Sequence, residues 1–242
     1  MVTSTTSQDA SSKSQIFAFS DIISVFVGQN KLEYRLHEAI LTTKSPFFEK
    51  CLCSGMKEQQ EKKVYLPDVN PSEFDIMIMW MYTEKVNPGR DNALITGVYL
   101  LADRFCMPDL QNGLVDAFRA NYNTYLINPM TVKNIWRLTP EGCKLREAAL
   151  DLMFNRLCQN PSQYRTASVG KSATTPQKPE SEFAIEFAIE FEKLLQENGP
   201  LPSALFWKRH DHNPPTAYSL PPDPSSMSGC VYHVHANGKK CK

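Results

Sequence analysis

The feature that most constrains this chain is a pair of alternating segments near its start, after which almost every apolar pattern has helical spacing. Residues 22–27 and 32–36 alternate between two faces, and a turn containing Gly28 separates them. Because successive side chains of a strand point to opposite faces of a sheet, this pattern predicts a hairpin with Ile23, Val25 and Val27 on its buried face. A third, short strand is expected at residues 64–66.

Capping residues followed by proline predict where helices begin. Asn70-Pro71 is the clearest case, because the apolar residues at 74, 77, 78 and 81 then share one face of a helix. A capping side chain can accept an orphan backbone N–H, and proline has no N–H to leave unpaired. Strands and short helices followed by helices alone predict an α+β fold with an α-helical extension. The same capping signal occurs at Ser45-Pro46, Asn128-Pro129 and Thr139-Pro140.

Proline content divides the rest of the chain. Seven of the 17 prolines lie in the first 160 residues and ten lie after them. The stretch 162–181 is almost without apolar side chains, so it cannot offset the entropy lost on ordering. The expected organisation, in chain order, is a disordered head at 1–14, a folded body at 15–125, a helical extension at 126–160, a flexible linker at 161–180, an amphipathic helix at 181–198 and a mostly irregular, proline-rich tail at 199–242.

The expected helix at 181–198 leaves two interpretations open. It repeats the tetrapeptide Glu-Phe-Ala-Ile and places Phe183, Phe187, Phe191 and Leu194 on one face. This face is too wide to remain in water, so the helix either docks on the helical extension of the same chain or binds another protein.

Charge and composition exclude several classes of protein. Lys plus Arg (26) equals Asp plus Glu (26), which argues against a nucleic-acid-binding module because such a module needs a basic face. No apolar run approaches the ~20 residues that cross a bilayer, and the Ser/Thr-rich head lacks the apolar core of a secretory signal. Seven cysteines, an odd number, predict reduced thiols. We therefore expect an intracellular protein of the cytoplasm or nucleus.

Several short motifs occur in order along the body. They are Ser20-Asp21-Ile22, Leu36 to Leu41, Ser45-Pro46-Phe47-Phe48, Val64 to Val69, Tyr82-Thr83, Leu101 to Phe105 and Met107 to Leu110. Together they resemble a BTB/POZ domain, and residues 135–146 resemble the helical extension that follows this domain in many proteins of filamentous fungi. The resemblance implies a BTB/POZ fold and a protein-interaction module without catalysis. Members of the family self-associate, recruit partners or connect substrates to a cullin-type ubiquitin ligase.

Four residues of the body are candidates for binding partner proteins. Met56 and Glu58 form a hydrophobic-x-acid triplet with Lys57, and the resemblance implies that such a triplet at this place contacts a cullin scaffold. Methionine would supply an adaptable apolar plug and the acid would orient the partner. The alternative is a mobile charged loop. Asp21 and His37 would line a polar pocket for a partner, or else Asp21 would accept backbone N–H groups and His37 would cap the following helix.

The tail carries the candidate metal ligands Cys230, His233, His235 and Cys241. Two thiolates and two imidazoles within twelve residues suit a tetrahedral zinc site. The alternative is a polar alternation in a proline-rich tail that binds no metal. No other cofactor is expected.

The sequence thus predicts an interaction protein that could serve as a substrate adaptor of a cullin-type ubiquitin ligase. The alternatives are a self-associating scaffold or transcription co-regulator, which would pair with another BTB protein, and a zinc-binding tail that contacts nucleic acid. Catalysis and a small-molecule substrate are not expected, because the chain has no Gly-rich phosphate loop, no HExxH and no Gly-x-Ser-x-Gly motif.

Overall fold

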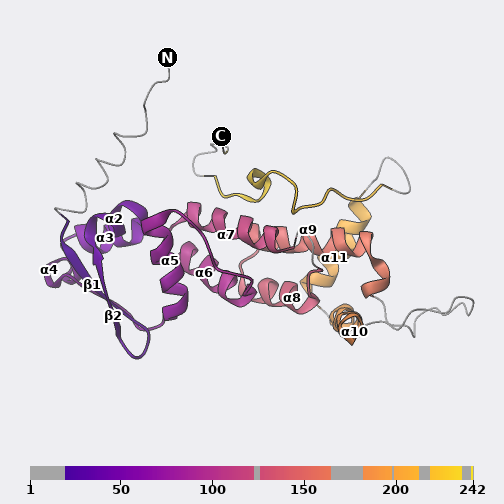
Figure 1. Ribbon diagram of the computed structural model, residues 1–242, viewed down its shortest axis with the longest axis horizontal. Helices are drawn as coiled ribbons and strands as arrows, with labels where there is room; N and C mark the ends of the chain where they lie inside the picture. The colour runs from indigo at the N-terminus through magenta and orange to yellow at the C-terminus, as the bar shows by residue number, and fades with distance from the viewer. Residues whose placement is uncertain are drawn as a thin grey trace, which may run out of the picture. The chain divides into compact units, whose positions relative to one another are not determined.

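The computed structural model describes residues 20–122, 126–164, 182–197, 199–212, 219–235 and 241 (Figure 1). These residues form two compact units. The first comprises residues up to Pro88 and Gly97–Gly113, and the second comprises Gly89–Thr96 and the residues from Leu114 onward. The predicted head at 1–14, residue 125 at the predicted domain boundary and residues 165–180 of the predicted linker lie outside the described residues.

A three-stranded mixed sheet is the centre of the first unit. The strands are β1 (Ile22–Val27), β2 (Leu32–His37) and β3 (Lys63–Leu66), in the order β2-β1-β3. β1 is antiparallel to β2 and parallel to β3, so that Val25 lies opposite both Tyr34 and Val64. The predicted hairpin and third strand are confirmed, and Ile23, Val25 and Val27 are fully buried as expected.

Short helices pack with this sheet, and the Ser-Pro-Phe-Phe motif connects two of them. The Ser45 side chain accepts the Phe48 backbone N–H and donates to the Phe105 carbonyl oxygen at 2.8 Å. The Phe48 and Phe105 rings then stack with centroids 5.2 Å apart. The helices of this unit are α2 (Glu38–Lys44), α3 (Pro46–Cys53), α4 (Lys57–Glu61) and α5 (Pro71–Thr83), with parts of α6 (Asn92–Arg104) and α7 (Pro108–Asn121).

The predicted start of α5 is confirmed. The Asn70 side chain accepts the Ser72 N–H at 2.9 Å, and Pro71 is the first helical residue. The buried face contains Phe74, Met77, Trp80 and Met81, so Trp80 takes the place in the core that the spacing assigned to Ile78.

The second unit is helical. The helix α8 (Pro129–Leu138) begins at the predicted Asn128 cap and packs on α9 (Lys144–Gln159). A 3-10 turn, η1 (Pro161–Tyr164), follows α9, and α10 (Glu182–Gln196) packs on η1 and α8. The helix α11 (Pro200–Asp211) packs on α9, and a last 3-10 turn is η2 (Gly229–Tyr232). Of the two interpretations of the 181–198 segment, the structure therefore shows docking within the chain.

The predicted helix start at Thr139-Pro140 is wrong. Thr139 is the C-cap of α8, and its hydroxyl donates to the Ile135 carbonyl oxygen at 2.6 Å. Cys143 precedes α9, which begins at Lys144. A threonine can satisfy a carbonyl group at the end of a helix as well as an N–H at the start, and proline often follows a helix, so the dipeptide alone does not decide between the two ends.

Two predicted boundaries also need correction. Residues 161–164, assigned to the linker, form η1, and Tyr164 is buried with its ring centroid 5.5 Å from that of Phe191. The tail assigned to 199–242 contains α11, in which Leu201 and Leu205 are buried. Pro200 is the first residue of α11 and Pro202 lies in its first turn, where a missing N–H costs nothing.

No helix in the described ranges has the length and apolarity that a bilayer-crossing segment requires.

Candidate functional site

The predicted triplet lies where α3 ends and α4 begins. Met56 precedes the first residue of α4, and 44% of its surface is exposed. The side chain of Gln59 accepts the Gly55 N–H at 2.6 Å, and the Met56 carbonyl oxygen accepts the Gln59 N–H at 3.1 Å. These bonds tie the turn to the helix that follows it, so the triplet lies at the start of a helix.

Glu58 lies in the first turn of α4 and is partly buried. Burial raises the pKa of the Cys51 thiol, and the negative charge of Glu58 raises it further. The exposed apolar side chain of Met56 and the acid two residues later thus lie together at the start of α4.

Asp21 and His37 each contact a neighbouring element of the first unit. The His37 Nδ1 atom lies 2.9 Å from the Tyr82 hydroxyl, and its side chain makes no capping bond to α2. The Asp21 carboxylate pairs with the Lys62 ammonium at 3.1 Å. Hydrogen bonds to Glu38 and then to Asp21 raise the pKa of Lys62. Both side chains therefore connect neighbouring elements, and the expectation that they bind a partner stays a prediction.

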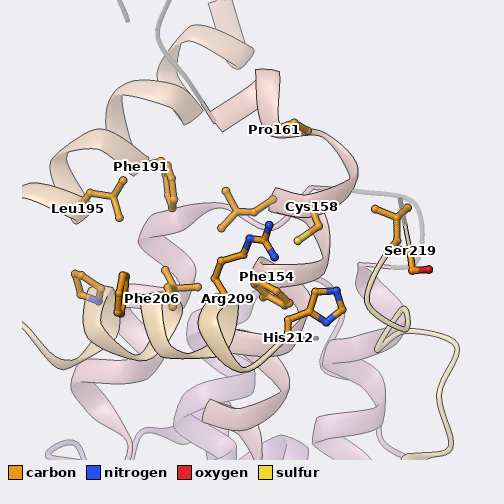
Figure 2. Close-up of a pocket in the computed structure, with 13 residues that line it drawn as sticks. Phe154, Cys158, Pro161, Phe191, Leu195, Phe206, Arg209, His212 and Ser219 are labelled. Carbon is orange, nitrogen blue, oxygen red and sulfur yellow. The ribbon is translucent and has the colours of Figure 1, made fainter. Parts of the chain in front are cut away.

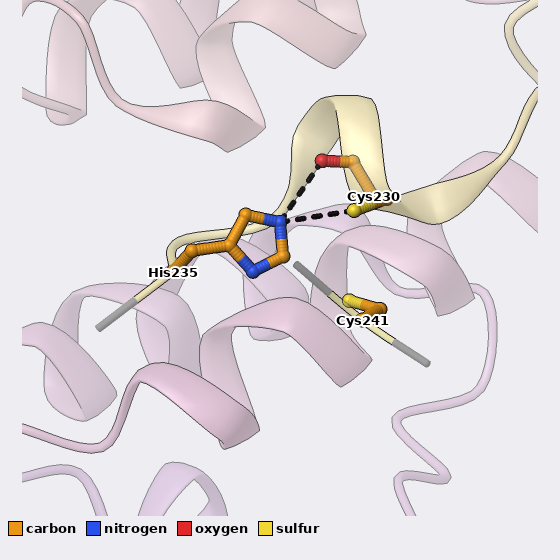
Figure 3. Close-up of side chains that lie close together, drawn as sticks. All are labelled: Cys230, His235 and Cys241. Atoms are coloured by element: carbon orange, nitrogen blue, oxygen red, sulfur yellow. Dashed lines mark hydrogen bonds between the residues drawn. The ribbon is translucent and has the colours of Figure 1, made fainter. Parts of the chain in front are cut away.

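The tail residues come together in the second unit. One donor atom each from Cys230, His235 and Cys241 lies within 4.8 Å of the other two (Figure 3). The His235 Nε2 atom is 3.1 Å from the Cys230 sulfur, and the His233 Nδ1 atom is 3.0 Å from the Cys241 sulfur. Partial desolvation and the neighbouring Cys230 sulfur raise the pKa of the Cys241 thiol.

A fifth residue, which the sequence analysis missed, completes this cluster. The carboxylate of Asp116 on α7 lies 2.9 Å from the His233 Nε2 atom, and the two residues are 117 positions apart in the chain. Asp116 is itself paired with Arg119 at 2.8 Å. No local pattern connects residues so distant, so sequence reasoning had no signal for this contact.

Residues 219–235 run along α7 and α9, as the yellow segment of Figure 1 shows, and buried arginines hold them there. The Arg119 guanidinium donates to the Pro224 carbonyl oxygen at 2.8 Å and to that of Met227, and it lies 4.9 Å from the Tyr232 ring centroid. The Tyr232 hydroxyl donates to Asp151 on α9 at 2.9 Å. Arg156 pairs with Asp223 at 3.1 Å. The tail is thus packed onto the helices by specific polar contacts.

A pocket of about 650 Å³ also opens in the second unit (Figure 2). Its walls are mostly apolar and come from α9, α10, α11 and residues 219–220, with the polar groups Arg209, His212 and Ser219 among them. The sequence analysis did not predict this pocket, because it forms from elements that are distant in the chain.

Comparison with known proteins gives a family match for the first part of the chain. Residues 11–122 match the sequence model of the BTB/POZ domain. A BTB/POZ domain-containing protein of Arabidopsis thaliana is 33% identical over 92 residues, which are 36% of this chain and 11% of that protein. Kelch-like protein 38 of Homo sapiens is 32% identical over 62 residues, 26% of this chain and 11% of that protein.

A third relative gives a longer match. Kelch-like ECH-associated protein 1A of Danio rerio is 27% identical over 113 residues, 46% of this chain and 18% of that protein. Each match thus covers less than a fifth of the relative's own length. The matched residues of this chain include the mixed sheet and the helices α2 to α7. Residues 11–122 therefore match the BTB/POZ domain, and the described residues of this range have its α+β fold, with the three-stranded mixed sheet and the helices around it.

Proposed function

We propose that this protein is a substrate adaptor of a cullin-type ubiquitin ligase, and that the start of α4 is where it binds the cullin. The observation that carries the proposal is the exposed Met56 side chain, held on an ordered turn immediately before Glu58. The family resemblance assigns a hydrophobic-x-acid triplet at this place to cullin contact.

The physical argument is one of a preorganised anchor. An exposed methionine can fit an apolar depression of variable shape, and little entropy is lost on binding because the turn is already ordered. Glu58 lies within one turn of Met56, whereas Glu61 is paired with Lys57 at 3.4 Å, so Glu58 is the acid that favours a basic partner surface. Anchors of this kind account for most of the binding energy of an interface.

The proposal is tested with the full chain and a purified cullin N-terminal domain, by titration calorimetry. We expect a dissociation constant in the micromolar range or tighter. Met56→Ala should weaken binding at least tenfold, about 1.4 kcal/mol, and Glu58→Lys should weaken it through charge reversal. Met79 is a matched control, because 59% of it is exposed on α5 of the same unit and Met79→Ala leaves the triplet intact.

Two results would overturn the proposal. One is the absence of association at micromolar concentration. The other is equal weakening by Met56→Ala and Met79→Ala. If light scattering then showed a stable dimer, the self-associating scaffold or co-regulator would replace the adaptor.

The remaining assignments concern the whole chain. We propose that it acts by binding alone, inside the cell, without a small-molecule substrate. We further propose that α8 and α9 are the helical extension found after BTB domains in filamentous fungi. The resemblance of residues 135–146 and the direct packing of α8 on α9 support this assignment.

A further inference from the structure

Three donor atoms in the tail lie at the spacing of metal ligands. A tetrahedral zinc ion with two sulfur and two nitrogen ligands holds its donor atoms about 3.3–3.8 Å from one another. The donor atoms of Cys230, His235 and Cys241 all lie within 4.8 Å of one another, and the His235 Nε2 atom is 3.1 Å from the Cys230 sulfur. A change of side-chain rotamer moves such donor atoms by about 1–2 Å, which would bring all three within bonding distance of one ion.

His233 is the nearest further donor, although it does not belong to the group of three whose donor atoms all lie within 4.8 Å of one another. Its Nδ1 atom is 3.0 Å from the Cys241 sulfur, so it would have to move towards the other two residues to become the fourth ligand. Its Nε2 atom lies 2.9 Å from the Asp116 carboxylate. A histidine that donates one ring N–H to a carboxylate keeps its other nitrogen unprotonated and oriented for a metal, which is the usual second shell of a zinc-bound histidine.

Gly229 makes this approach feasible. A Cβ atom at this position would lie 2.6 Å from the Asp116 Oδ1 atom and 2.8 Å from the His233 Nε2 atom, closer than van der Waals contact allows. The backbone of η2 therefore leaves room for the pair only because residue 229 has no side chain.

We propose that Cys230, His233, His235 and Cys241 bind one structural Zn²⁺ ion, which fastens the tail to α7 through Asp116. Two thiols and two imidazoles are the ligand set that zinc prefers, whereas calcium and magnesium prefer oxygen. Binding displaces the two thiol protons to solvent, so the ion and two thiolates are together neutral, and no electrons are transferred. The ion would bind near the C-terminal end of the 219–235 segment, which the hydrogen bonds of Arg119 and Tyr232 already attach to the helices.

The experiment uses the full chain purified under reducing conditions and elemental analysis for zinc. We expect one zinc per chain. Replacement by Co²⁺ should give the strong visible absorption of tetrahedral cobalt together with a thiolate-to-cobalt charge-transfer band. Cys241→Ser should lower zinc affinity at least a hundredfold and remove the charge-transfer contribution of one sulfur. Cys241 is exposed, so this variant should keep its circular dichroism spectrum.

Matched variants separate this site from other thiols and from the proposed cullin contact. The double variant Cys51→Ser and Cys53→Ser removes the Cys-x-Cys pair of the first unit and should keep its zinc. Asp116→Asn tests the positioning role and should weaken zinc binding about 10–100-fold, with a shift in the cobalt spectrum. Cys241→Ser should leave cullin binding unchanged, and Met56→Ala should leave zinc content unchanged, so each proposal can fail without the other.

Three outcomes would overturn the zinc site. The reduced protein could contain no zinc and give no tetrahedral cobalt spectrum. The Cys51 and Cys53 variant could lose zinc while Cys241→Ser retained it. The intact mass of protein purified without reductant could show Cys230 and Cys241 joined as a disulfide, with no zinc taken up after reduction.

Discussion

The sheet of the first unit and the 219–235 segment of the second unit are held in place by different forces. Ile23, Val25 and Val27 in β1 are fully buried among other apolar side chains. The 219–235 segment is held by several polar contacts, among them those of the buried guanidinium groups of Arg119 and Arg156. Apolar packing is roughly proportional to area and tolerates small shifts, whereas each hydrogen bond of a buried cation requires one particular partner.

This difference has a consequence for function. A core held by apolar packing opens as a unit, but a segment held by a few polar contacts can detach by itself when one contact is lost. The first unit is therefore suited to present a rigid surface such as the start of α4. The 219–235 segment is therefore the part of the second unit that a single substitution should release.

The largest expected effect is in the first unit. Phe48→Ala removes a fully buried ring that stacks on Phe105, and it should lower the free energy of unfolding by about 3–5 kcal/mol. Urea unfolding followed by fluorescence measures this loss. Phe206→Ala is the control, because 63% of Phe206 is exposed, and it should change stability by about 0.5 kcal/mol or less. Equal effects of the two substitutions would show that the apolar core does not hold the first unit as argued.

An intermediate effect is expected in the tail. Arg119→Leu leaves the carbonyl oxygens of Pro224 and Met227 without their donor, at a cost of about 2 kcal/mol. Hydrogen exchange measured by mass spectrometry should be roughly 30-fold faster in residues 219–235 and unchanged in β1. The exposed Arg137 on α8 is the control, and Arg137→Leu should leave both rates unchanged. Equal acceleration in β1 would mean that the tail does not open independently.

The same contrast explains which parts of the molecule the sequence predicts. The hairpin, the third strand and the caps at Ser45, Asn70 and Asn128 depend on residues a few positions apart, and all are present in the structure. The role of Thr139-Pro140 was mistaken because the local signal fits either end of a helix.

The tail was harder to predict, because its order depends on partners more than a hundred residues away. The Cys and His residues themselves could be picked out by type and spacing. Asp116 and Arg119, which orient His233 and hold the backbone, have no signal near residue 230. The helix α11 was missed because its prolines were taken as a sign of irregular structure, although both lie in its first turn.

The smallest expected change in stability concerns an exposed hydrogen bond of the first unit. The Tyr34 hydroxyl donates to the Asp75 carboxylate at 2.7 Å, and desolvation followed by this carboxylate raises the pKa of Tyr34 to about 12. In the unfolded chain the phenol ionises near its ordinary pKa of 10.0. The contact therefore stabilises the fold fully below pH 10, and this contribution is lost as the pH rises from 10 towards 12.

Tyr34→Phe should remove this contribution and cost about 1 kcal/mol at neutral pH. Urea midpoints measured at intervals between pH 8 and pH 12 test both statements, with the pH limits taken from the ordinary and raised pKa values of Tyr34. The stability difference between the original protein and the variant should be constant up to about pH 10 and then shrink. A difference that grew with pH would mean that the folded state favours the phenolate, which is the opposite of what the carboxylate at 2.7 Å requires. A cost at neutral pH as large as that of Arg119→Leu would show that polar contacts hold the first unit as firmly as they hold the tail.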